Sequence, residues 1–180
     1  MLLSKTFYWQ NKETLMNDLK SALTEYSEKF VATTRKTVDK IENFRKINRC
    51  ALVYDRGQYT ILPPVLGILF DQDFTGVDLE CLWNPEEFDV YAARELELSI
   101  ISSSQEIINQ KCRENRRNED AVVSMLVDSC AEMSRWLRET LKKNDVFFFA
   151  TDPEMVETKK NVRAINNIVG NVDDRMPDWF

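Results

Sequence analysis

The chemistry open to this chain is limited from the start, because its 180 residues include no histidine. This absence excludes the Ser-His-Asp and Cys-His mechanisms, the zinc sites that use histidine and the facial-triad iron sites. Catalysis would have to use carboxylates, lysine, tyrosine or cysteine. A metal site would be built from carboxylates alone, which favours magnesium, calcium or manganese.

Two carboxylates, Asp71 and Asp73, directly follow the apolar run Val65–Phe70. A carboxylate at the end of a strand, beside a magnesium ion, can accept a phosphoryl group without help from histidine. The segment ILFDQDFT resembles the first motif of the haloacid dehalogenase family of phosphotransferases. The resemblance implies that Asp71 is the nucleophile and that Asp73 is the general acid and base.

The same resemblance extends to shorter segments nearer the C-terminus. Thr151 resembles the second motif of that family, Lys159 or Lys160 its basic third motif, and Asp173 or Asp174 its acidic fourth motif. The helices expected between residues 85 and 143 would stand where those enzymes insert a cap. The implied activity is that of a magnesium-dependent phosphotransferase or phosphatase.

A structural interpretation accounts for the same aspartates. Residues 71–76 have the composition of a turn between two strands, in which aspartate side chains bind the backbone and Gly76 supplies a positive φ. About twenty residues separate Thr151 from Asp173, too few for the strand–helix unit that a parallel sheet needs there. This spacing favours the turn.

Two further charged groups have structural explanations. The basic cluster 111–117, with Lys111, Arg113, Arg116 and Arg117, is offset by nearby acids and has no aromatic neighbour, so we expect a solvated loop between helices. The acidic set Glu86, Glu87 and Asp89 lies in the first turn of an expected helix, where acids oppose the helix dipole.

Aromatic residues gather at both ends of the sequence. The N-terminal group is Phe7, Tyr8 and Trp9, and the C-terminal pair is Trp179 and Phe180. Exposed aromatic side chains are unfavourable on a free monomer but suit docking onto a neighbouring chain. We therefore take these five residues as the candidate partner-binding residues.

Composition sets the class of the protein. A net charge of −6 argues against a general nucleic-acid binder, and 43% apolar residues can supply one core without disulfides or a metal ion. No signal peptide or membrane-spanning run is visible, and the four cysteines form no CxxC pair. We expect a soluble protein of the cytoplasm, or of a virion if the protein is viral.

Periodicity predicts a single α+β domain over residues 1–180. An antiparallel β-meander is expected at about residues 50–83, with strands near 51–54, 59–62, 65–70 and 76–83. A long N-terminal helix at 12–47, possibly broken near 32–34, and two or three C-terminal helices should pack on it. The sequence also predicts a strand at 2–9, with Asn11 as the cap of the helix that follows, and a buried strand at 146–150. The C-terminal helices are expected at 85–112, 118–143 and 152–170.

These patterns together favour a non-catalytic subunit that binds a protein partner or assembles with copies of itself. A virion or phage tail or neck component is one concrete example. We expect no cofactor and no nucleic-acid or membrane partner. The alternatives are the phosphotransferase described above and an acidic inhibitor or immunity-type protein that masks a basic partner.

Overall fold

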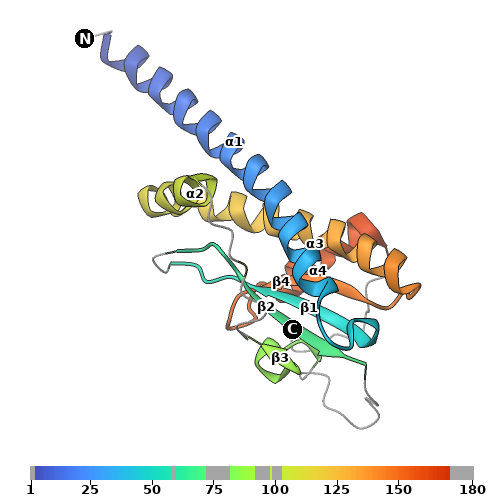
Figure 1. Ribbon diagram of the computed structural model, residues 1–180. Coiled ribbons are helices and arrows are strands. Elements are labelled where there is room, and N and C mark those ends of the chain that lie inside the picture. The colour runs from blue at the N-terminus through green and yellow to red at the C-terminus, as the bar shows by residue number, and fades with distance from the viewer. Residues whose placement is uncertain (1–2, 58–59, 72–81, 92–97, 99–102, 171–180) are drawn as a thin grey trace.

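The computed structural model describes residues 3–57, 60–71, 82–91, 98 and 103–170, and in the first helix it describes side chains from residue 18 onward. Within these residues the elements in chain order are as follows (Figure 1): α1 (Leu3–Asp39), η1 (Phe44–Lys46), β1 (Ile47–Val53), β2 (Val65–Phe70), η3 (Pro85–Glu87), β3 (Val90–Tyr91), α2 (Ser103–Glu114), α3 (Asn118–Leu141), β4 (Phe147–Thr151) and α4 (Thr158–Val169).

The sheet has four strands in the order β3-β2-β1-β4. β1 is antiparallel to β2 and parallel to β4, with Val53 opposite both Val65 and Thr151. The predicted α+β class is confirmed, with a long N-terminal helix and three C-terminal helices around the sheet. The sheet is mixed rather than a purely antiparallel meander, because the strand predicted at 146–150 pairs with β1.

Every residue of β1 and β4 is buried, because both faces of the sheet are covered. On one face α3 packs against β4, and the Ser134 hydroxyl accepts a hydrogen bond from the Phe148 backbone N–H at 2.9 Å. On the other face Trp83 lies against Phe147 and Phe149, with ring centroids 5.6 and 5.4 Å away. The helices therefore form one layer and the segment around η3 the other (Figure 1).

A buried arginine lies on the Trp83 face of β1. The guanidinium carbon of Arg49 is 5.2 Å from the ring centroids of both Trp83 and Phe147, and its Nη1 donates to the Asn48 side chain. Cation–π contacts of this kind offset part of the cost of taking a charge out of water.

The N-terminal part of the chain differs from its prediction. Residues 3–9, predicted as a strand, belong to α1, so Asn11 is not a helix cap. The segment contains no Gly or Pro, and helix propagation from residue 12 toward the N-terminus outweighs the β propensity of three aromatics. The break predicted near 32–34 does not occur, and α1 ends at Asp39, before Asn43 takes a φ of 66°.

The segment between β1 and β2 is also not the predicted hairpin. Residues 60–62 form no strand, because Asn109 of α2 takes both backbone groups of Leu62: its Oδ1 accepts from Leu62 N at 3.1 Å and its Nδ2 donates to Leu62 O at 2.9 Å. In the strand predicted at 76–83, residues 76–81 lie outside the described part of the chain and residues 82–83 are not in a strand.

The predicted helix at 85–112 is divided. Asn84 caps a helical turn as expected, accepting from Glu86 N at 3.1 Å, but η3 ends at Glu87 because Phe88 is extended and the short strand β3 follows. Helix α2 then covers residues 103–114. The last helix starts at Thr158 rather than at Asp152, and Gly170 ends it with a φ of 66° as predicted.

Candidate functional site

Asp71 lies at the end of β2, where its partly exposed carboxylate contacts two neighbouring side chains. Its Oδ1 accepts from the Asn48 amide at 2.9 Å, and its Oδ2 pairs with the Lys143 ammonium. Lys143 also donates to the Arg45 carbonyl oxygen at 3.1 Å. The carboxylate therefore joins the end of β2 to the start of β1 and to the segment between α3 and β4. Its partners are side chains rather than the backbone groups expected for the turn at 71–76, and the rest of that turn lies outside the described residues.

Thr151 lies at the opposite end of the sheet from Asp71. Phe70 is opposite Ile47 at the start of β1, whereas Thr151 is opposite Val53 at its end. The Thr151 hydroxyl is hydrogen-bonded to the Thr158 hydroxyl at 2.5 Å. The structure thus separates the residues that resemble the first and second phosphotransferase motifs.

The remaining residues of that resemblance do not join Asp71 either. Lys159 and Lys160 lie in α4, on the Thr151 side, and Lys160 is 3.9 Å from Glu157. Asp73 and Asp174 lie outside the described residues. Within the described part of the chain, no three Cys, Asp or Glu residues are grouped so that they could hold a metal ion.

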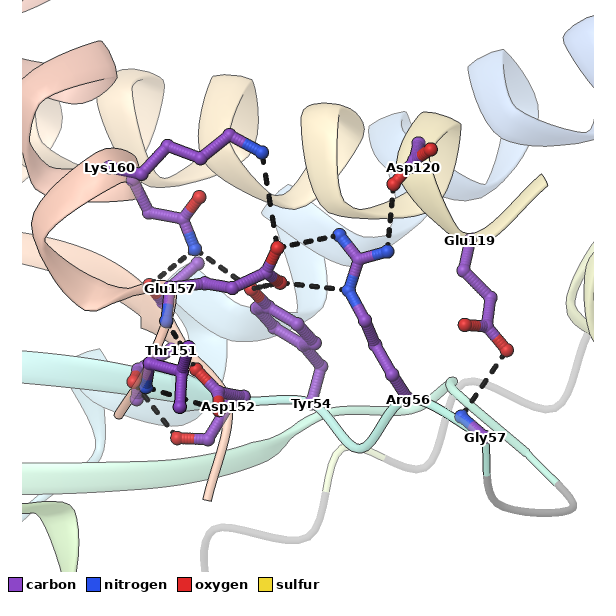
Figure 2. A network of polar contacts seen from close by, with 12 residues as sticks. Tyr54, Arg56, Gly57, Glu119, Asp120, Thr151, Asp152, Glu157 and Lys160 are labelled. Carbon is purple, nitrogen blue, oxygen red and sulfur yellow. Dashed lines mark hydrogen bonds and ion pairs between the residues drawn. The ribbon is translucent and has the colours of Figure 1, made fainter. Parts of the chain in front are cut away.

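A polar network that the sequence did not reveal occupies the Thr151 end of the sheet (Figure 2). Arg56 binds Glu157 through two hydrogen bonds, from Nε to Oε2 at 2.8 Å and from Nη2 to Oε1 at 3.0 Å. The Tyr54 hydroxyl donates to Glu157 Oε2 at 2.6 Å and accepts from Asn161 Nδ2 at 2.8 Å. Three elements meet here: the end of β1, the loop after β4 and α4.

The same network reaches the start of α3. Arg56 Nη1 donates to Asp120 at 2.8 Å, and this hydrogen bond, with the positive charge of Arg56, holds the pKa of Asp120 below its ordinary value. Asp152 positions Glu157 by accepting hydrogen bonds from the backbone N–H groups of Val156 and Glu157, at 3.2 and 2.7 Å.

This network, which we call the clasp, consists of Tyr54, Arg56 and Glu157 with their partners, and its contacts are those of a structural ion-pair network rather than of a catalytic site. Burial raises the pKa of Tyr54, with a further contribution from its hydrogen bond to Glu157, so the hydroxyl stays protonated at neutral pH. The Glu157 carboxylate is held by a charged donor and a phenol. The only sequence signal for it was the Gly-containing turn that carries Arg56, because its partner lies 101 positions away.

The two charged clusters lie only partly where the sequence predicted them: the basic cluster begins inside α2, and Asp89 lies beyond the end of η3. The basic cluster 111–117 spans the end of α2 and its connection to α3, and Lys111 pairs with Glu114 at 3.4 Å. Glu86 and Glu87 lie in η3, while Asp89 accepts from the Phe70 backbone N–H at 2.7 Å.

Of the five candidate partner-binding residues, three fall in α1. Phe7, Tyr8 and Trp9 belong to the N-terminal half of this helix, which extends away from the rest of the protein in Figure 1. Trp179 and Phe180 lie outside the described residues. From Leu19 onward one stripe of α1 is buried in the body, including Ala22, Tyr26 and Phe30.

Comparisons with known proteins add no relative: no family model, curated protein or solved structure matches this chain. Among the described residues, none of the helices combines the length and apolar character needed to cross a membrane.

Proposed function

We propose that this protein is a non-catalytic, self-assembling subunit and that the N-terminal half of α1 pairs with the same helix of a second copy. The observation that carries this proposal is the extension of α1 beyond the body of the protein (Figure 1). Helices that bury no face against other elements are marginal in water, so a partner for this half is expected to stabilise it.

The sequence of the extending half supports pairing on the same stripe that the body buries. Leu19, Ala22 and Tyr26 recur at three- and four-residue steps. Leu15 continues the series toward the N-terminus, and Tyr8 lies on the same face one heptad earlier, beyond the polar residues Asn11 and Lys12. These positions share one face of a helix. Apolar residues sustained along one face are typical of helices that pair side by side.

Charge favours a second copy, arranged antiparallel, as the occupant. Residues 3–18, ahead of the part of α1 that is buried in the body, carry Lys5 and Lys12 toward the N-terminus and Glu13 and Asp18 toward the body, so the charges of this segment sum to zero but are unevenly placed. When position 8 of one copy stands opposite position 15 of the other, position 5 stands opposite position 18. This arrangement brings Lys5 of one copy to Asp18 of the other and places Tyr8 opposite Leu15.

The test is the mass of the full chain in solution, measured by size-exclusion chromatography with light scattering over a range of concentrations. We expect a dimer or a larger assembly for the natural chain and a monomer for the double variant Tyr8→Glu, Leu15→Glu. Thr6→Glu places the same charge on the opposite side of the helix and should leave the assembly intact. A natural chain that stays monomeric up to its solubility limit would overturn the proposal.

A further inference from the structure

A cavity of about 430 Å³ lies beside the polar network, between the turn at Gly57, the end of α2 and the start of α3. Its walls include Gly57, Ile61, Cys112, Arg113, Arg116 and Glu119. The volume is within the range of roughly 300–1,000 Å³ that is typical of small-molecule sites. Opposite charges therefore line one small space.

The buried carboxylate of Glu119 has few hydrogen-bond partners. Its exposed fraction is 7%, and its one hydrogen bond within the described part of the chain comes from the Gly57 backbone N–H at 3.3 Å (Figure 2). A carboxylate withdrawn from water needs strong donors to offset its lost hydration. One long hydrogen bond from a neutral donor leaves Glu119 able to bind a cation or a further donor.

Arg116 provides a positive charge at the same cavity. Its guanidinium lies over Gly57, such that a Cβ atom added there would be 3.4 Å from Nη1. Among the described residues the Arg116 guanidinium forms no hydrogen bond or ion pair, and it does not reach the Glu119 carboxylate within ion-pair distance. The Glu119 backbone N–H donates to the Arg116 carbonyl oxygen at 3.0 Å, so the two side chains are one helical turn apart.

Arg113 adds a second positively charged side chain to the lining, and Ile61 and Cys112 belong to its uncharged part. Ile61 is buried, and burial raises the pKa of the Cys112 thiol to about 11, with a further contribution from the charge of Glu119. The thiol is therefore uncharged at neutral pH. The turn that brings Ile61 to the cavity is fixed by the two hydrogen bonds between Asn109 and the Leu62 backbone.

We propose that this cavity binds a small amphoteric molecule, with the chemistry of a free α-amino acid, whose ammonium group is held by Glu119 and whose carboxylate is held by Arg116. Ammonium and carboxylate groups on one carbon atom can bridge two side chains that are one helical turn apart. Ile61 and Cys112 form the apolar wall for the rest of the molecule. This site is independent of the self-assembly proposed for α1.

The experiment is a calorimetric titration of the full chain with each of the standard L-amino acids. We expect saturable binding of one or a few of them, with one molecule per chain. Glu119→Gln, which keeps an acceptor for the Gly57 N–H, and Arg116→Gln should each weaken binding at least about tenfold, because each removes one charged contact. Arg117→Gln removes the neighbouring arginine, which does not line the cavity, and should change nothing.

Two analogues of the tightest ligand complete the test, one lacking its carboxylate and one lacking its amino group. Both should bind at least about tenfold more weakly than the parent. Circular dichroism of each variant checks that the chain is folded. The proposal is overturned if no amino acid binds at millimolar concentration, if folded Glu119→Gln and Arg116→Gln variants bind as the natural chain does, or if inorganic phosphate binds equally well to the natural chain and to Glu119→Gln.

Discussion

Arg56 and Glu157 form a bidentate ion pair across 101 positions of sequence, with N–O distances of 2.8 and 3.0 Å. Arg56 follows β1 and Glu157 precedes α4, so the pair fixes the turn after the central strand against the last helix. The Tyr54 hydroxyl shares Glu157 Oε2 with Arg56 Nε. The two side chains are in direct contact, but they can meet only after the chain between them has folded.

Glu157→Gln is expected to lower the free energy of unfolding by about 1–2 kcal/mol, because it replaces charge-assisted hydrogen bonds with neutral ones at a partly exposed site. Urea denaturation at neutral pH measures the change. Glu154→Gln, an exposed neighbour, is the matched control and should change stability by less than about 0.5 kcal/mol. Equal effects of the two substitutions would show that the clasp contributes nothing specific.

The Arg56–Asp120 contact predicts a dependence on pH. Arg56 lowers the pKa of Asp120 in the folded state, so the contribution of this contact to stability is present above the ordinary carboxyl pKa and is lost as the pH falls through the lower folded value. In Arg56→Gln the pKa of Asp120 should rise toward its ordinary value. Carbon NMR of the side-chain carboxyl measures it, and an unchanged pKa would contradict the assignment of the shift to Arg56.

Asp71 and Lys143 should be energetically coupled, since the ammonium of Lys143 contacts Asp71 Oδ2. A double-mutant cycle with Asp71→Asn and Lys143→Met should give a coupling of up to about 1 kcal/mol, the range of partly exposed ion pairs. The same cycle in high salt should give a smaller value. A coupling of zero at low salt would show that the contact between Asp71 and Lys143 does not contribute to stability.

The fold class followed from features that act locally. Apolar periodicity predicted α3 and the interior of α1, and Gly170 marked the end of α4. The errors arose where tertiary contacts decide. The residues that precede Leu62 in the sequence are typical of a strand, but its backbone N–H and C=O are hydrogen-bonded to the Asn109 side chain. No local sequence pattern identifies a partner 47 positions away.

Gly67 should tolerate no larger residue. A Cβ added there would be 3.3 Å from ring atoms of both Phe88 and Tyr91, so Gly67→Ala should cost about 1–3 kcal/mol through overpacking. Gly170→Ala differs in its cause, because nothing lies within 4 Å of its added Cβ and the cost there comes from the positive φ. Thermal unfolding measures the loss; an unchanged stability of Gly67→Ala would contradict the packing argument.

Asn109→Ala should lower the free energy of unfolding by about 2 kcal/mol, because it removes the partner of the buried Leu62 N–H and leaves the Leu62 carbonyl oxygen with one long hydrogen bond from Gln105 Nε2 at 3.5 Å. Gln110→Ala, the exposed neighbour in α2, removes only a hydrogen bond to Glu114 and is the control. Chemical denaturation measures the free energy of unfolding of both variants. Similar losses in the two would indicate a general effect on the stability of α2 rather than the loss of the hydrogen bonds between Asn109 and Leu62.

The candidate sites were less accessible to sequence reasoning than the fold. Asp71 was singled out by its position after an apolar run, and the geometry that decides how its carboxylate is used depends on Lys143, far along the chain. Glu119 lies in the first turn of α3, where an acid is favourable beside the helix N-terminus. Its burial beside a cavity depends on how the turn at Gly57 packs against that helix end, and sequence spacing carries no information about that contact.

The pairing of β1 with β4 has a consequence for the order in which the protein can be completed during synthesis. Arg49 and Cys50 leave the ribosome well before their partners Phe147 and Phe148, and α2 and α3 are made in between. Until then an entirely buried strand of the finished protein has one unpaired edge, the kind of surface on which nascent chains aggregate. A chain whose translation stops before Thr151 is therefore expected to need chaperone protection that the full-length product does not.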